Sequence, residues 1–293
     1  MFSKSTLAVV SVVATTVLAQ SYPADLSDSC LNFYKAFDAD TTFKTCTSAL
    51  NDATSGYSNS SSTDAPTKES ITSTLKTVCA STTTANDNDP CSDTAIRGKL
   101  AEFATACRAE FDAKRADVIS TYDSLYAYSP LKTALCSKDD AGNYCVMSAS
   151  TYASQNSALT EGVKQQLFSA TDSTNLTAMG DANAPFLFLS PDLDAGKLCT
   201  VCTRNILTGY QVFAQNTPHA AGLANSELFK GEPALFQAVS DKCDANFLNT
   251  GASQGVGGIG KGSSKNGAFQ VRAVDFVAVI AGVVSTAVFA AYL

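Results

Sequence analysis

The sequence predicts a mainly α-helical domain, a bundle whose helices are cross-linked by disulfide bonds and which is followed by a flexible Gly/Ser stalk. Apolar residues recur at three- and four-residue spacings through most of the chain, which is typical of amphipathic helices. The chain contains 10 cysteines, and several of them lie at apolar positions of these helices. An apolar segment near each end frames this region, which is the arrangement of an exported protein.

The amino-terminal residues are typical of a secretory signal peptide. Lys4 precedes an apolar run over residues 7–18, and the small residue Ala19 follows it. A helix needs about 20 apolar residues to cross a bilayer, so this run is too short to be a membrane anchor. We therefore assign residues 1–19 to a signal peptide and expect the mature chain to begin at Gln20.

The carboxyl-terminal residues are typical of a signal for a glycosylphosphatidylinositol (GPI) anchor. An apolar segment, residues 276–293, follows a short polar spacer and a cluster of small residues. No Lys or Arg follows the segment, whereas a retained membrane helix normally carries such residues on its cytoplasmic side. We expect the anchor at Asn266, with Ser263 and Ser264 as alternatives, and removal of residues 267–293; a retained transmembrane helix is the other interpretation.

The cysteines all lie between the two terminal signals. An even number of cysteines in an exported chain predicts a disulfide framework, in preference to a zinc or redox centre. The sequence leaves the connectivity open, although a turn-rich loop between Cys136 and Cys145 suggests that these two pair locally. The sequons at Asn59 and Asn175 predict N-glycosylation. The expected disulfide cysteines are Cys30, Cys46, Cys79, Cys91, Cys107, Cys136, Cys145, Cys199, Cys202 and Cys243.

The apolar pattern predicts helices from residue 20 to residue 248, and residues 249–266 form the stalk that carries the anchor. A short helix pair is expected first, then another helix, with these apolar positions: Cys30, Phe33, Tyr34 and Phe37; Phe43, Cys46 and Leu50; Ile71, Leu75, Val78 and Cys79.

The longest helix is expected to begin at Asp89 and Pro90, because Asp is a common cap and Pro suits the first helical position. Glu110 and Lys114 are expected to form a favourable pair on its exposed side, and the helix should end before Pro130. Its predicted buried face consists of Ile96, Leu100, Phe103, Cys107, Phe111, Ile119, Tyr122 and Tyr126.

The apolar pattern of the second half of the sequence predicts a buried run of apolar residues and three further helices. Residues 157–168 are a helical candidate, and the run from Phe186 to Leu189 lies between Pro185 and Pro191. The last two helices are expected to turn these residues inward: Cys199, Cys202, Ile206, Tyr210 and Phe213 in one, and Leu235, Phe236, Val239, Cys243 and Phe247 after Pro233 in the other.

No catalytic, cofactor-binding or metal-ligating residue is predicted. Cys199 and Cys202 have the spacing of a redox motif, but such a motif follows a strand, so we expect each to bond a different neighbouring helix. His219 is the only histidine and stands beside Pro218, so neither a histidine metal site nor a histidine base is expected. The acidic run at residues 86–89 lacks the glycine and glutamate of a calcium loop.

The charge of the chain restricts its partners. The net charge is −7 at pH 7 and no basic stripe is present, so nucleic acid is not an expected partner. We expect contact with a membrane through the lipid anchor, and with cell-wall polysaccharide or other surface proteins.

The order of these features resembles a family of fungal GPI-anchored, cysteine-rich cell-surface proteins. The resemblance rests on the pair Cys30 and Cys46, the long helix with Cys107, residues 135–145, residues 198–207 (LCTVCTRNIL), and the final stalk and apolar tail. The conserved domain of that family has no assigned function. The resemblance implies a location at the fungal cell surface, wall or plasma membrane, and implies no activity.

The expected function is therefore that of a non-enzymatic structural or binding module of the cell surface. Two alternatives remain open. A carboxylate-based surface hydrolase would need a cleft with two acids about 5–9.5 Å apart, and a carrier of a small hydrophobic ligand would need a large apolar cavity.

Overall fold

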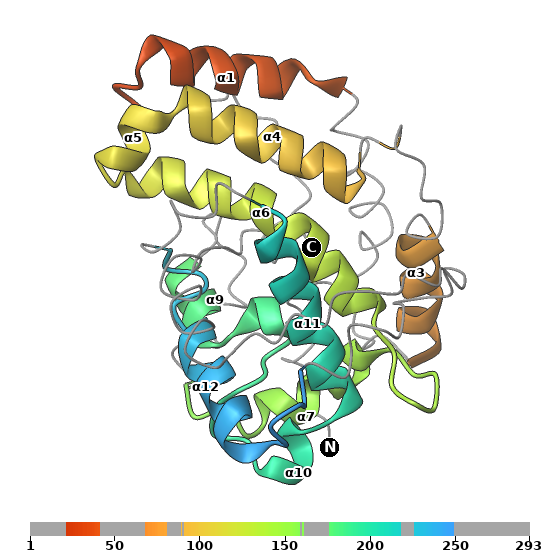
Figure 1. Cartoon of the computed structure of the whole chain (residues 1–293). Helices are drawn as coiled ribbons and strands as arrows, with labels where there is room; N and C mark the ends of the chain where they lie inside the picture. Colours follow the sequence, from red (N-terminus) through yellow and green to blue (C-terminus); the bar gives the residue numbers. More distant parts are fainter. Residues whose placement is uncertain are drawn as a thin grey trace, which may run out of the picture.

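The computed structural model describes residues 22–41, 68–80, 89, 91–158, 160, 176–217 and 226–248. These residues are mainly helical and contain no strand apart from an isolated bridge between Lys138 and Tyr144, so the predicted fold class is confirmed (Figure 1). The signal peptide, Cys46, Asn59, Asn175, His219, Asn266, the stalk and the apolar tail lie outside the described residues.

The described helices follow one another in this order: α1 Asp28–Ala39, α3 Lys68–Ala80, α4 Asp93–Ala106, α5 Arg108–Asp112, α6 Ala116–Cys136, η3 Cys145–Ser148, α7 Ala149–Ala153, α9 Leu176–Asp181, η4 Ala184–Phe186, α10 Ala195–Leu198, α11 Val201–Gln215 and α12 Glu232–Lys242. Among the described helices, none is long and apolar enough to cross a membrane.

Helix α6 is the centre of the fold. Residues 122–131 are buried without interruption, so every face of this part of the helix is covered by protein. Helices α4, α11 and α3 all contact α6, and α1 packs on α4 from the far side (Figure 1). A helix that is covered on all sides must be apolar on all sides, which α6 largely is.

Aromatic side chains form two clusters in the core. In one, the ring of Phe103 of α4 stacks on Phe33 of α1 at 4.6 Å and meets Tyr122 of α6 edge-on at 5.5 Å. In the other, the ring of Tyr210 of α11 lies 4.6 Å from that of Phe186 and 5.6 Å from that of Phe229. Ring pairs at such distances add about 0.5–1.5 kcal/mol each to the stabilisation from buried area.

Four described disulfide bonds connect separate elements of the fold. They are Cys30–Cys107, Cys79–Cys136, Cys145–Cys202 and Cys199–Cys243. Cys91 is disulfide-bonded as well, and no described cysteine is free.

The predicted local bond between Cys136 and Cys145 is wrong. Hydrogen bonds close the loop between them instead, since the Cys145 N–H donates to the Ser137 carbonyl at 2.8 Å. The two sulfurs therefore reach other elements, α3 from Cys136 and α11 from Cys145.

The predicted long helix from residue 89 is wrong in its bounds, because the structure has α4, α5 and α6 in its place. Ser92, not Asp89, caps α4, and its hydroxyl accepts from the Ala95 N–H at 3.2 Å. Lys114 has a φ of 54°, a left-handed conformation that ends the helical path before α6. The exposed pair of Glu110 and Lys114 is also wrong, because Glu110 is only 4% exposed.

Pro130 lies inside α6, so the prediction that the helix ends before it is wrong too. An internal proline costs about 3 kcal/mol because it removes one helical hydrogen bond and crowds the preceding turn. The burial of apolar side chains around Pro130 offsets that cost, which local sequence rules do not include.

The second half agrees better with the predictions. The run from Phe186 to Leu189 is buried, and α12 begins beside Pro233. Ser157 and residue 158, the start of the helical candidate 157–168, lie in a turn, and most of that candidate lies outside the described residues. Cys199 is the cap residue that ends α10, so it does not belong to the same helix as Cys202.

Two glycines give a matched test of this packing. A side chain at Gly180 would collide with the backbone carbonyl of Glu227, whereas one at Gly98, on the exposed side of α4, would meet nothing within 4 Å. We expect Gly180→Ala to lower the free energy of unfolding by about 1–3 kcal/mol, and Gly98→Ala to raise it by up to about 1 kcal/mol. Urea unfolding of both variants checks this, and a Gly180→Ala variant as stable as the wild type would contradict the described contact between α9 and residue 227.

Candidate functional site

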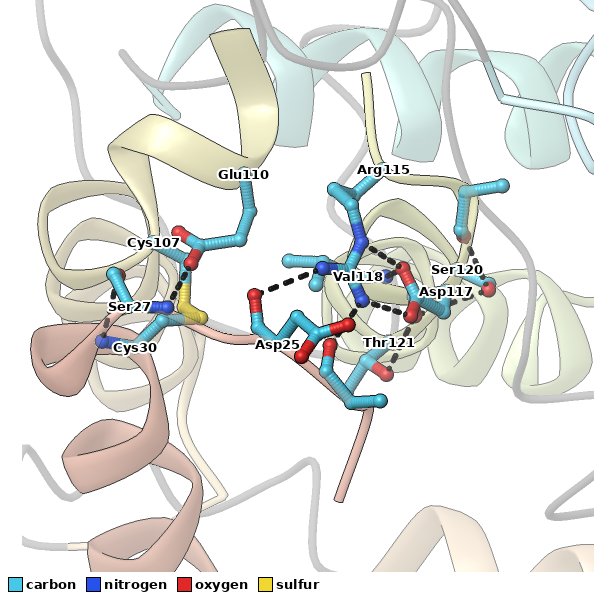
Figure 2. Close-up of polar contacts among 12 residues, drawn as sticks. Asp25, Ser27, Cys30, Cys107, Glu110, Arg115, Asp117, Val118, Ser120 and Thr121 are labelled. Carbon is cyan, nitrogen blue, oxygen red and sulfur yellow. Dashed lines mark hydrogen bonds and ion pairs between the residues drawn. A yellow bond between two sulfur atoms is a disulfide. The ribbon is translucent and has the colours of Figure 1, made fainter. Parts of the chain in front are cut away.

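A network of polar contacts holds the chain before α1 against α5 and α6 (Figure 2). Ser27 caps α1, and its backbone N–H donates to Oε1 of Glu110 at 2.6 Å. Burial opposes ionisation of Glu110, but hydrogen bonds, chiefly from Ser27, and the charge of Arg115 together outweigh it, so the pKa of this carboxyl is lowered. Glu110 therefore stays charged in a buried position.

Arg115 forms the second half of the same network (Figure 2). Its guanidinium donates to the carbonyls of Ala24 at 2.8 Å and Asp25 at 3.2 Å, and it pairs with the Asp117 carboxylate at 2.6 Å. The hydrogen bond from Arg115 is the main cause of the lowered pKa of Asp117. We call these residues, together with Ser27 and Glu110, the amino-terminal clamp, because they fix the segment that follows the predicted signal peptide.

The clamp includes a group of potential metal ligands. The two sulfurs of Cys30 and Cys107 and a carboxylate oxygen of Glu110 lie within 4.8 Å of one another, the single such group found among the described residues. A metal binds the thiolate form of cysteine, and here the sulfurs are bonded to each other. The chemistry of this group is therefore that of a disulfide beside a carboxylate, and the residues do not fit a metal.

A second polar group lies inside the core, where α6, α11 and the start of α12 meet. Asp123 of α6 is 1% exposed, and its Oδ1 has no hydrogen-bond partner. Burial raises the pKa of Asp123 well above its usual range, although a hydrogen bond with Ser226 acts in the opposite direction. Burial thus favours the neutral form of this carboxyl over the ionised form.

Glu232 is the other buried acid, and it is the first residue of α12. The residue is partly exposed, and burial raises the pKa of its carboxyl to about 8. Tyr126 and Tyr210 lie close enough that the charge of Glu232 adds to the effect of burial and raises the pKa of both hydroxyls. We call Asp123, Glu232, Ser226 and the two tyrosines the acid cluster.

A buried segment, residues 182–190, which includes η4, lies beside Tyr210 of the acid cluster. The amide of Asn183 donates to the Leu189 carbonyl at 2.8 Å, and Asn156 donates to the Ala182 carbonyl at 2.9 Å. The Tyr210 hydroxyl donates to the Pro185 carbonyl at 2.7 Å. Side-chain donors thus satisfy backbone carbonyls that no helix or strand can pair.

The acid cluster was not predicted from the sequence. Glu232 looks like an ordinary acid in a first helical turn, where carboxylates are common. The sequence does contain a sign of the buried acid at Asp123, because this charged residue interrupts a helical segment that is otherwise mainly apolar on all sides. Neutral carboxyls can donate hydrogen bonds or a proton, and that is the chemistry which this group offers.

The predicted roles of Cys199 and Cys202 are confirmed. Cys199 bonds to Cys243 after α12, and Cys202 bonds to Cys145 in η3, so the two cysteines hold different neighbouring elements. Neither forms the Cys-x-x-Cys disulfide that a redox motif uses.

The fold and these contacts define a disulfide-cross-linked helical domain with a buried acidic group. A family model described as a domain of unknown function (DUF7729) matches residues 16–252, and the chain belongs to that family. A search of curated proteins found no match, and a search of solved structures also found none.

The buried carboxylate of the clamp can be tested against an exposed one. Replacing Glu110 with Ala leaves the Ser27 N–H without its acceptor, so we expect the free energy of unfolding to fall by about 1–3 kcal/mol. Glu102→Ala, which removes a largely exposed carboxylate of α4, should change it by less than about 0.5 kcal/mol. Chemical denaturation at pH 7 measures both, and equal effects would contradict the structural role of Glu110.

The acid cluster predicts an unusual dependence of stability on pH. Glu232 has a pKa of about 8 when folded and an ordinary value of 4.5, so its stabilising contribution is complete below pH 4.5 and is lost as the pH rises through 8. Burial raises the pKa of Asp123 as well. We expect the free energy of unfolding to fall by up to about 1.4 kcal/mol per pH unit between pH 4.5 and 8 through the titration of Glu232.

The control for this prediction is a pair of isosteric variants on one helix. Glu232→Gln, which imitates the neutral acid, should flatten the decline, whereas Asp241→Asn at an exposed position of α12 should leave it unchanged. Urea unfolding at pH values from 5 to about 9 gives the slopes, and a wild-type slope equal to that of Glu232→Gln would contradict a neutral Glu232.

Proposed function

We propose that this protein is an extracellular surface protein, held on the outer leaflet of the plasma membrane by a GPI anchor, whose helical domain is a structural or binding module of the cell surface or wall. The disulfide framework carries this proposal. Each of the four described bonds joins two separate elements, and no described cysteine is free. Such frameworks form in oxidising compartments and persist outside the cell.

The patterns at the two ends of the sequence support the same cellular location. Residues 1–19 have the pattern of a secretory signal, and Asn266 lies among the small residues before the apolar segment 276–293. The expected glycans at Asn59 and Asn175 agree with export. The fungal origin follows from the resemblance of the cysteine pattern to fungal surface proteins, and it is part of the proposal.

A module of this kind gains from resistance to unfolding and proteolysis. The disulfides span 44 to 77 residues of sequence, and closing loops of this length stabilises the folded state by about 4 kcal/mol each in the chain-entropy model. Cell-wall polysaccharide and other surface proteins are the partners that we propose, with no role for nucleic acid because the chain is acidic.

A surface hydrolase is the second candidate, and one observation favours it. Glu232 is held neutral near pH 7, as a general acid of a glycosidase must be. Asp123, the other acid of the cluster, argues against a hydrolase. It is only 1% exposed, so a polymeric substrate could not reach it in this conformation. We therefore prefer the structural or binding module.

Release from intact cells tests the anchor. With an epitope tag in the stalk, residues 249–266, treatment with a phosphatidylinositol-specific phospholipase should move the protein from the cells into the medium. Changing Val283 and Val284 to Lys interrupts the apolar segment, so this variant should not reach the surface in anchored form. Protein that stays on the membrane and still contains residues 276–293 by mass spectrometry would overturn the GPI proposal and support a retained helix.

A further inference from the structure

The two ends of α12 are attached in different ways. At its carboxyl end, Cys243 is bonded to Cys199, and the Lys242 ammonium donates to the carbonyls of Pro191 at 2.6 Å and Leu193 at 3.0 Å. At its amino end, the helix is held by side-chain packing and by the acid cluster. The carboxyl end is therefore fixed covalently, and the amino end is free to separate if its non-covalent contacts weaken.

The segment before α12 makes those contacts. Phe229 meets Phe186 at 5.3 Å and Tyr210 at 5.6 Å, and Gly231 lies directly against the Asn183 side chain. Ser226 is buried and forms a hydrogen bond with Asp123. Glu232 lies close enough to Tyr126 of α6 and Tyr210 of α11 for its charge to raise the pKa of both hydroxyls.

Neither acid of the cluster forms an ion pair with a described residue. The cation nearest in sequence, Lys230, pairs with Asp181 at 2.7 Å and with Glu227 at 3.3 Å. One oxygen of Asp123 also lacks a hydrogen-bond partner. The titratable and charged groups that α6, α11, α9 and the segment before α12 bring to this region are Tyr122, Asp123, Tyr126, Tyr210, Asp181, Glu227 and Lys230.

We propose that the start of α12 is a pH-sensitive latch, docked on α6 and α11 while Glu232 and Asp123 are protonated and released when they ionise. An unpaired charge is far more costly inside the protein than in water, so ionisation favours the open arrangement. The first turn of the helix then opens and leaves α6 and α11, while its disulfide-bonded end stays in place. Opening exposes the apolar surfaces of Phe229 and Phe236, both buried in the closed state.

The pKa of Glu232 in the two arrangements sets the pH range, from its ordinary value of 4.5 when the carboxyl is released to about 8 when it is docked. Between these values the equilibrium constant for opening rises by up to about tenfold per pH unit for one ionising group, and above pH 8 it levels off because the carboxyl is ionised in both arrangements. This inference does not depend on the proposed location of the protein.

Hydrogen exchange followed by mass spectrometry tests the latch on the intact folded domain with its disulfides oxidised. The informative amides are those of Glu232, bonded to the Phe229 carbonyl at 2.8 Å, and Leu235, bonded to the Gly231 carbonyl at 3.1 Å. After correction for the intrinsic effect of pH on exchange, their protection should fall by up to about tenfold per pH unit between pH 5 and about 8, and it should level off above 8. Amides of α4 should keep their protection.

Two variants complete the test. Glu232→Gln should keep the start of α12 protected at high pH, and Asp241→Asn should behave as the wild type. Asp123→Asn serves as a second neutral variant, and it should also reduce the loss of protection. The latch is overturned if Glu232→Gln loses protection as the wild type does, or if α4 and α12 lose it together, since that result indicates global unfolding.

Discussion

The burial of α6 on every side is the constraint on which the rest of the structure depends. Thirteen of its 21 residues are buried, including an unbroken stretch around Pro130. A helix of this kind has no face for water, so neighbouring elements must cover its whole circumference. Helices α4, α11 and α3 do so, and α1 lies outside them against α4. The helices are thus arranged in layers, with α6 at the centre, α4, α11 and α3 around it, and α1 outermost.

The disulfides act on the covering elements more than on the centre. Only Cys136 belongs to α6, at its last residue, while the other described bonds join α1 to the end of α4, η3 to α11, and α10 to α12. Apolar burial holds α6 in place without them. The outer elements have less buried surface, and several are short, so cross-links that restrict the unfolded chain contribute most there.

Sequence patterns predicted the helices well and their limits poorly, for identifiable reasons. The apolar spacing continues through Cys107 and Phe111, so it gives no sign that the chain turns at Lys114. Pro130 is a reliable helix breaker only where solvent surrounds the helix, and here tertiary packing outweighs its cost. The disulfide pairing was not predictable either, because it depends on which helix ends meet in space, as the distant partners of Cys136 and Cys145 illustrate.

The acid cluster shows a different limit of sequence reasoning. A buried acid such as Asp123 lowers stability unless it is neutral or paired, and an apolar residue of similar size would pack in its place at lower cost. Its neutrality depends on residues from α6, α11 and the segment before α12, which are adjacent only in the folded chain. The same acids also make the docking of α12 conditional on protonation, while the disulfide at Cys243 keeps the other end fixed. A helix attached in this way combines a permanent connection with a reversible one, which a wholly apolar interface would not provide.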